Sequence, residues 1–205
     1  MDYLSEIQAY KVRQASPSPG RTALLVIDMQ RYFEGMARPI LKNIMGLIDA
    51  CRTAGIKITF TRHGHHNPKQ DGGMLARWWG DLIIYGTDEW ELIKELSPKS
   101  DEPIIDKTRY SAFYGTNLDE WLHQNAVEDL IITGVLTNCC CETTARDAFV
   151  RDYRVFFVAD GTATINDELH LASLKNLVFG FAHVVDANSL CGWAMSSSHP
   201  SRNHQ

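Results

Sequence analysis

The chain has 205 residues, 44% of them hydrophobic and 22% charged, and its formal net charge is −5 at pH 7. This composition is ordinary for a globular protein and excludes the disordered, collagen-like and coiled-coil classes. The negative charge argues against nucleic acid or a membrane surface as a partner. The length suits one domain with a good core and is too short for two catalytic domains and a linker.

The first 20 residues hold four apolar side chains, Tyr3, Leu4, Ile7 and Tyr10, and end in ASPSPG. We predict that residues 1–20 form an arm that packs on the domain or on a neighbouring subunit. The start of the chain has no basic stretch followed by an apolar one, and no apolar run approaches the length that spans a bilayer. The expected location is therefore the cytoplasm.

Short, apolar, β-branched runs alternate with longer stretches of helical spacing after the arm, which is the pattern of parallel strands joined by helical crossovers. The expected strands are residues 22–27, 56–61, a short run at 104–105, 129–133, 154–159 and 183–186. The expected helices are residues 40–54, ended by Gly55, and 87–96, 117–124, 138–150 and 167–181. The prediction is an α/β fold, a three-layer α/β/α Rossmann-like domain over residues 21–193 with a mainly parallel sheet of about six strands.

Two segments fall outside this alternation. Residues 63–86 hold three histidines, several glycines and two tryptophans without clear regular structure. A loop of that length in a compact domain is typically a functional lid or wall. Residues 194–205 are rich in serine and polar side chains, which predicts a disordered tail.

The five cysteines include three in a row, Cys139, Cys140 and Cys141. Neighbouring cysteines rarely pair without strain, so this is not a disulfide framework, and a reducing compartment is expected. The run follows a predicted strand and opens a predicted helix, where the positive end of the helix dipole favours a thiolate. Successive helical positions face different directions, so at most one of the three points to a given site, and composition does not say which.

Ligands of an open α/β sheet gather beyond the carboxyl ends of its strands. Asp28 follows the first predicted strand and Lys107 follows the run at 104–105, so both fall at the same edge as the cysteines. Lys107 would favour the thiolate, and Asp28 could accept the thiol proton and return it to a leaving group. Each residue also has an ordinary interpretation, as a turn aspartate, a solvated lysine and a small core cysteine.

Three segments resemble the isochorismatase-like cysteine hydrolase superfamily, and the resemblance runs from about residue 22 to residue 186. They are TALLVIDMQRYF (22–33), DKTRYSAFYGTNL (106–118) and ITGVLTNCCCETTARDAF (132–149). Within that superfamily the chain looks most like the plant-type nicotinamidases. The resemblance implies that Asp28, Lys107 and Cys140 are the catalytic aspartate, lysine and nucleophile. It also implies a cis peptide between Val135 and Leu136, and the backbone N–H groups of Leu136 and Cys140 would then form an oxyanion hole.

The expected function is hydrolysis of a small amide or ureide through a thioester on Cys140. Phe33, Trp79 and Phe113 are the candidate walls for a flat substrate. His63, nearest the end of its strand, is the histidine most suited to face the pocket. The family commonly forms dimers or tetramers, so a homodimer or homotetramer is expected.

No cofactor and no metal are expected. Many nicotinamidases hold a divalent metal through an aspartate and histidines, which makes His63, His65 and His66 candidates. The loop TRHGHHNPKQDGG lacks the usual Asp-x-His opening and the later histidine, so a solvated or substrate-contacting loop is favoured.

Two alternatives remain open. An isochorismatase would cleave a vinyl ether to pyruvate by acid catalysis from Asp28, and it would not need Cys140. A catalytically silent interaction module could use the same fold, because fold does not fix function.

Overall fold

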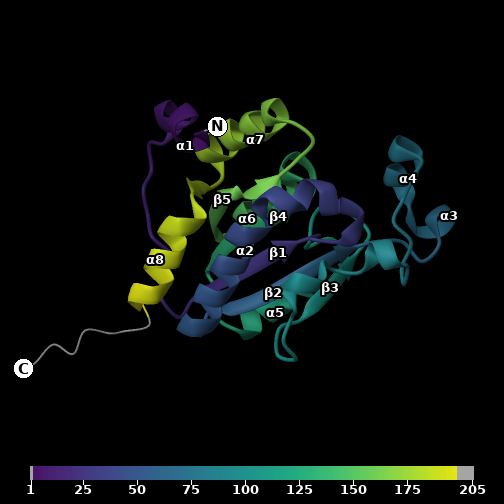
Figure 1. Cartoon of the computed structure of the whole chain (residues 1–205), viewed down its shortest axis with the longest axis horizontal. Coiled ribbons are helices and arrows are strands. Elements are labelled where there is room, and N and C mark those ends of the chain that lie inside the picture. The colour runs from purple at the N-terminus through teal and green to yellow at the C-terminus, as the bar shows by residue number, and fades with distance from the viewer. Residues whose placement is uncertain (1, 198–205) are drawn as a thin grey trace, which may run out of the picture.

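The computed structural model describes residues 2–197, which form one α/β/α body around a six-stranded sheet (Figure 1). All neighbouring strands are parallel, and their order is β3-β2-β1-β4-β5-β6. The strands are β1 (Thr22–Ile27), β2 (Lys57–His63), β3 (Ile104–Lys107), β4 (Asp129–Val135), β5 (Arg154–Ala163) and β6 (His183–Val185). The predicted fold class is confirmed. The strand order reverses between β1 and β4, and such a point is where this kind of sheet opens a crevice for a ligand.

Helices cover both faces of the sheet, which is why the central strands β1 and β4 are buried along their whole length. On one face α2 (Glu34–Ala54) packs against α8 (Ala187–Ser197) and closes one hydrophobic cluster. On the other face α5 (Leu118–Gln124), α6 (Glu142–Val150) and α7 (Asp167–Gly180) close a second cluster. The predicted helix at residues 40–54 begins earlier, at Glu34, and ends at Gly55 as expected.

The N-terminal segment packs on its own domain, one of the two arrangements expected for the arm. It contains α1 (Tyr3–Glu6) and a 3₁₀ turn at Gln8–Tyr10. Ile7 is fully buried in the cluster beneath α7. The Tyr3 hydroxyl lies 2.8 Å from Asp167 Oδ1 at the start of α7 and donates a hydrogen bond to it.

The predicted helix at residues 87–96 is wrong, because two 3₁₀ turns, Asp88–Trp90 and Lys94–Leu96, stand there instead. Backbone groups of this segment bond to the loop after β1. The Ile93 N–H donates to the Met29 carbonyl, and the Trp90 carbonyl accepts from the Gln30 side chain. These long-range partners replace the i→i−4 bonds that a helix would need.

The predicted disordered tail, residues 194–205, begins too early in the sequence, since residues 194–197 belong to α8 and Ala194 is fully buried. The single small side chain of Ala194 lets α8 pack closely against its neighbours. The rest of the predicted tail, residues 198–205, lies outside the described residues.

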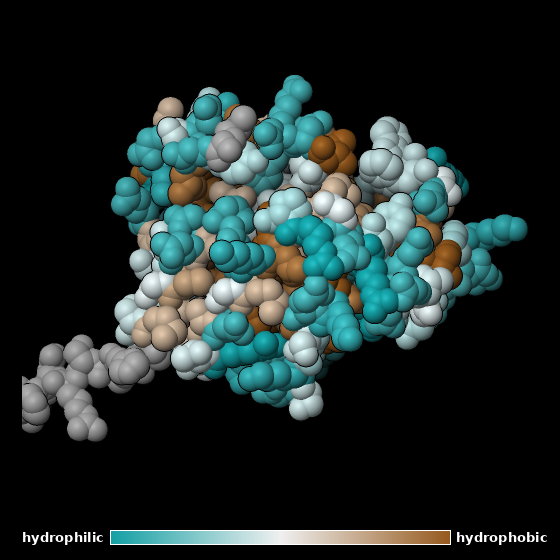
Figure 2. All heavy atoms as spheres, viewed as in Figure 1, coloured by the Kyte–Doolittle hydropathy of each residue, from teal (hydrophilic) through white to brown (hydrophobic). Residues whose placement is uncertain are grey.

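The loop expected at residues 63–86 contains two short helices, α3 (Pro68–Asp71) and α4 (Gly73–Trp79). They stand apart from the body at one end of the molecule (Figure 1). Figure 2 shows that hydrophilic side chains cover most of the visible face, with apolar ones in small separate patches. None of the helices within residues 2–197 has the length and apolar character needed to cross a membrane.

Candidate active site

Asp28, Lys107 and Cys140 meet at the carboxyl edge of the sheet, beside the point where the strand order reverses. The Lys107 ammonium lies 2.7 Å from Asp28 Oδ2 and 3.4 Å from Cys140 Sγ. Asp28 and Lys107 are buried, and the Asp28 carboxylate also contacts the Cys140 thiol. Strand β3 is not a neighbour of β1, so the long lysine side chain reaches across β2 to make this contact.

Asp28 is held in an unusual backbone conformation directly after β1. Its φ is +50°, in the left-handed region that non-glycine residues rarely adopt, and its side chain is fully buried. Thr61 on β2 fixes it, because the Thr61 hydroxyl donates to Asp28 Oδ1 at 2.6 Å and the Asp28 N–H donates back to Thr61. Strain of this kind is found where the surroundings hold a functional group in one orientation.

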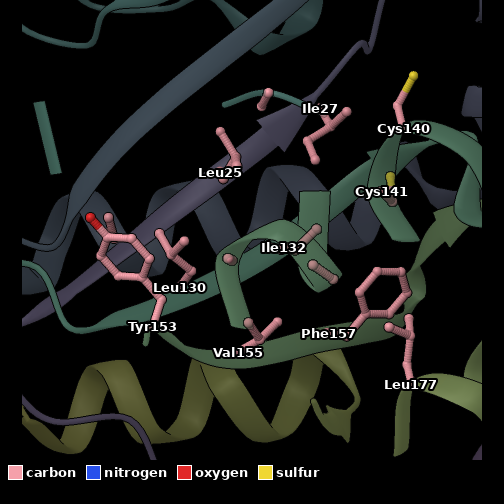
Figure 3. Close-up of a cluster of buried hydrophobic side chains, with 14 of the residues drawn as sticks. Leu25, Ile27, Leu130, Ile132, Cys140, Cys141, Tyr153, Val155, Phe157 and Leu177 are labelled. Carbon is pink, nitrogen blue, oxygen red and sulfur yellow. The ribbon is translucent and has the colours of Figure 1, made fainter. Parts of the chain in front are cut away.

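Cys140 lies in a π-helical turn, Thr137–Cys141, between β4 and α6. The Leu136 carbonyl accepts hydrogen bonds from the N–H groups of Cys139 and Cys141, on either side of the candidate nucleophile. Figure 3 shows the Cys140 side chain pointing away from the packed core side chains, and Cys141 lying nearer to them. Of the two, Cys140 is therefore the thiol that faces the site.

The end of β4 brings this turn close to Asp28. Gly134 has φ +117°, and a Cβ there would lie 2.0 Å from the Ile27 carbonyl oxygen, so only glycine allows the two strands to approach. The peptide bond between Val135 and Leu136 is cis, as the resemblance implied. It precedes the turn from which the N–H groups of Leu136 and Cys140 were expected to form an oxyanion hole.

Burial opposes the thiolate that the helix end and Lys107 were expected to favour at Cys140. Burial raises the pKa of Cys140, and Asp28 raises it further, while Lys107 lowers it by less. Burial would lower the pKa of Lys107, but Asp28 and Cys140 outweigh burial and raise it. The resting site therefore holds an ammonium, a carboxylate and a neutral thiol, because burial in low dielectric favours one anion beside one cation rather than two.

A cavity of about 360 Å³ opens beside the thiol. Three of the four predicted substrate-binding residues, Phe33, His63 and Trp79, line it, as do Leu136 and Cys140. The other lining residues are mostly aromatic or aliphatic. They are Tyr32, Met36, Leu75, Asp81, Leu82, Ile83, Tyr110, Asn138, Cys139, Thr164, Ile165 and Leu169.

The prediction that Phe113 is a wall of the pocket is wrong. Phe113 is buried in the core, where its ring stacks on Tyr153. Tyr110, three residues earlier, takes the expected place. Its hydroxyl accepts a hydrogen bond of 2.7 Å from Trp79 Nε1 and also contacts the Cys139 thiol. Cys139 therefore lines the cavity and is not the core residue that was expected beside the nucleophile.

His63 is held in place through its backbone. The Gln30 side chain accepts from the His63 N–H at 2.7 Å and donates to its carbonyl at 2.9 Å. Burial and the nearby ammonium of Lys107 lower the pKa of His63 to about 3. The imidazole that borders the cavity is therefore neutral at physiological pH.

The three candidate histidines of the loop do not meet at one point. The ring of His65 lies 5.1 Å from that of His63, and its Nδ1 atom contacts Asp71 Oδ1 at 3.2 Å, whereas the ring of His66 stacks on Tyr85. Within residues 2–197 no group of three or more His, Cys, Asp or Glu side chains is arranged to hold a metal ion. The reactive groups that the site brings together are the Cys140 thiol, the Asp28 carboxylate and the Lys107 ammonium.

Comparison with known proteins agrees with this geometry. The family model described as Isochorismatase domain matches residues 22–189. Nicotinamidase 3 of Arabidopsis thaliana is 48% identical over 189 residues, which cover 91% of this chain and 95% of that protein. The Isochorismatase of Bacillus subtilis (strain 168) is 35% identical, and the match covers 90% of this chain but 64% of that longer protein. A crystal structure of a cysteine hydrolase from Pseudomonas syringae pv. phaseolicola 1448A superposes with a TM-score of 0.85 at 28% identity, over 91% of this chain and 97% of that one.

Proposed function

The chain belongs to the isochorismatase family and is a hydrolase of carbon–nitrogen bonds, and we propose that it cleaves a small neutral aromatic amide, with nicotinamide as the first candidate, through a thioester on Cys140. The observation that favours this substrate is the lining of the cavity. Its walls include the aromatic rings of Phe33, Trp79 and Tyr110, which suit a flat ring.

The charge of the lining argues against anionic substrates. Among the described residues that line the cavity there is no lysine or arginine, and His63 is neutral because its pKa is lowered. The Lys107 ammonium lies behind the thiol and is paired with Asp28. A carboxylate entering an apolar cavity without a cationic partner loses hydration that nothing restores. Isochorismate and ureidoacrylate both carry carboxylates, whereas nicotinamide carries none.

The contacts of the site support the following reaction. Asp28 accepts the Cys140 thiol proton as the sulfur attacks the amide carbonyl carbon, so the negative charge passes from the carboxylate through the sulfur to the carbonyl oxygen. The tetrahedral oxyanion accepts hydrogen bonds from the N–H groups of Leu136 and Cys140. The carbon–nitrogen bond then breaks, ammonia leaves with the proton from Asp28, and a thioester remains. Water, deprotonated by Asp28, cleaves the thioester and releases the carboxylic acid.

A substrate panel tests the proposal. We expect ammonia release from nicotinamide, with kcat/KM at least about 100-fold above that for ureidoacrylate, because the cavity has no cation for the carboxylate. Cys140→Ala should abolish the reaction. The matched control is Cys191→Ala, because Cys191 lies on α8 and does not line the cavity, so this variant should keep wild-type activity. Equal turnover of the neutral and the anionic amide would contradict the proposal.

The similarity to the Isochorismatase of Bacillus subtilis supports a second candidate reaction, the cleavage of a vinyl ether to pyruvate. Here Asp28 would act as an acid, so Cys140→Ala would leave pyruvate formation largely intact. Pyruvate release from isochorismate by the wild type, unchanged in Cys140→Ala, would replace the amide proposal with this one. An inert protein in both assays would favour the interaction module. The cytoplasmic location and the homodimer or homotetramer stay predictions.

A further inference from the structure

We infer that the same cavity accepts amides whose aromatic ring bears a fixed positive charge, the N-alkylpyridinium carboxamides, and that Asp81 at the cavity selects for them. This inference rests on the proposed function and adds a second class of substrate to it. It concerns the charge that the cavity favours, which the family membership leaves open.

Asp81 is the one charged side chain among the described residues that line the cavity. It follows Gly80 at the end of α4, and the Tyr32 hydroxyl donates a hydrogen bond of 3.3 Å to Asp81 Oδ2. This hydrogen bond holds Asp81 Oδ2 next to Tyr32, which also lines the cavity. Asp81 is solvent-exposed, so its attraction for a ligand cation is moderate and depends on salt.

The aromatic walls favour the same charge. Phe33, Trp79 and Tyr110 line the cavity, and the face of an aromatic ring attracts a cation through its quadrupole. The hydrogen bond from Trp79 Nε1 to the Tyr110 hydroxyl fixes the indole relative to the loop after β3. A flat cationic ring between such faces gains both stacking and electrostatic attraction.

No lysine or arginine stands among the described residues that line the cavity. His63 stays neutral because burial lowers its pKa to about 3. The ammonium of Lys107 is matched by the Asp28 carboxylate at 2.7 Å, so the catalytic residues together present no net charge.

The chemical step is the same as for nicotinamide. The thiol sulfur bonds to the carboxamide carbon, the carbon–nitrogen bond breaks, and ammonia leaves with the proton held by Asp28. Hydrolysis of the thioester gives a pyridinium carboxylate, an inner salt without net charge. The alkylated ring nitrogen takes no part, so the reaction needs no oxidant or further reactant.

The test compares two amides of the same shape, 1-methylnicotinamide, a cation, and 3-methylbenzamide, its neutral counterpart. We expect the wild type to hydrolyse both, and the ratio of their kcat/KM values to fall about three- to fivefold in Asp81→Asn and about tenfold or more in Asp81→Lys. Intrinsic reactivity cancels, because the same two amides are compared in each variant. Added salt should lower the ratio in the wild type and leave it unchanged in Asp81→Asn.

A ratio that stays within twofold across the three proteins would overturn the role of Asp81. Failure of the wild type to release ammonia from 1-methylnicotinamide, while it hydrolyses nicotinamide, would overturn the whole inference. If nicotinamide itself is not hydrolysed, the proposed function fails first, so the two failures are distinguishable. Circular dichroism spectra and thermal unfolding midpoints that match those of the wild type show that the Asp81 variants are folded.

Discussion

The Lys107 ammonium touches both groups of the site that can be anionic, Asp28 Oδ2 at 2.7 Å and Cys140 Sγ at 3.4 Å. The ammonium also donates a hydrogen bond of 2.9 Å to the backbone carbonyl of Arg109, and this third contact fixes the position of the ammonium. One buried cation stabilises one anion, and the proton can move from sulfur to carboxylate without a change in net charge. The negative charge therefore stays beside the Lys107 ammonium at the moment of attack.

Removing the proton acceptor should stop this transfer. Asp28→Asn keeps the shape of the side chain, and we expect kcat for nicotinamide to fall by about 10²- to 10⁴-fold. Thr61→Val removes only the hydroxyl that donates to Asp28 Oδ1, and we expect about a tenfold loss. Steady-state ammonia release measures both, and an Asp28→Asn enzyme with more than a tenth of wild-type kcat would exclude Asp28 as the base.

Single residues also show how far the sequence informs the site. Asp28, Lys107 and Cys140 lie in segments next to strands, so their place at the edge of the sheet was predictable. Phe113 was not, because whether an aromatic residue in an irregular segment points into a cavity or a core depends on the path of the loop. Tyr110 and Asp81 were missed for the same reason, since neither has a periodic pattern around it.

At the scale of elements, the junction between β4 and the π-helical turn determines where the nucleophile lies. The close approach of β1 and β4 at Gly134 places the turn beside Asp28, and the segment from Lys107 to Tyr110 ties α4 to the end of β3. The sequence analysis predicted that the loop between β2 and β3 is a functional lid or wall. Its two helices were not foreseen, because each is too short for a periodic pattern to emerge.

Gly134→Ala tests the junction. A methyl group would meet the Ile27 carbonyl at 2.0 Å in a backbone conformation that alanine disfavours, so we expect a loss of at least about 3 kcal/mol in the free energy of unfolding. Gly46→Ala, inside α2 with nothing within 4 Å, is the control and should stabilise the protein by about 0.5–1 kcal/mol. Urea unfolding measures both, and equal midpoints for the two variants would refute the packing argument.

Tyr110→Phe tests the link between α4 and the loop after β3. The substitution removes the acceptor of the Trp79 Nε1–H bond and leaves the ring in the cavity wall. We expect KM for nicotinamide to rise about three- to tenfold, since one hydrogen bond that orients the indole is lost, with kcat within about twofold. A fall in kcat at constant KM would assign Tyr110 to the chemical step instead of to substrate binding.

Several histidines across the molecule are partly or fully buried, and burial favours their neutral form. Burial lowers the pKa of His63, His65, His170 and His183, and that of His63 falls to about 3 from an ordinary value of 6.5. The unfolded chain binds protons at these sites below pH 6.5 and the folded chain does not. Their contribution to stability is therefore complete above pH 6.5 and is lost as the pH falls towards the folded-state pKa.

We expect the free energy of unfolding to decrease from pH 6.5 to pH 4.5. His63→Asn should make that decrease shallower by about 1 kcal/mol per pH unit, because one such histidine is removed. Urea unfolding at a series of pH values gives both slopes. Parallel slopes for the two proteins would mean that His63 is protonated in the folded state, against its burial.

The sheet was the most predictable part of the whole molecule. Its strands are short apolar runs bounded by polar residues, so six were expected and six are present. The strand order and the packing of the N-terminal segment on α7 depend on contacts between residues far apart in the sequence, and no local pattern specifies them. Helix α8 was not among the expected helices, because Gly192 and the serines at its end weaken the helical pattern in the sequence.

The central claim is that turnover passes through a thioester on Cys140, and hydroxylamine tests it most directly. Hydroxylamine competes with water for a thioester, so wild-type enzyme mixed with nicotinamide and hydroxylamine should form the hydroxamate of the ring acid along with ammonia. Cys140→Ala should form neither product. Ammonia release by Cys140→Ala at the wild-type rate, or turnover by the wild type without any hydroxamate, would contradict the account.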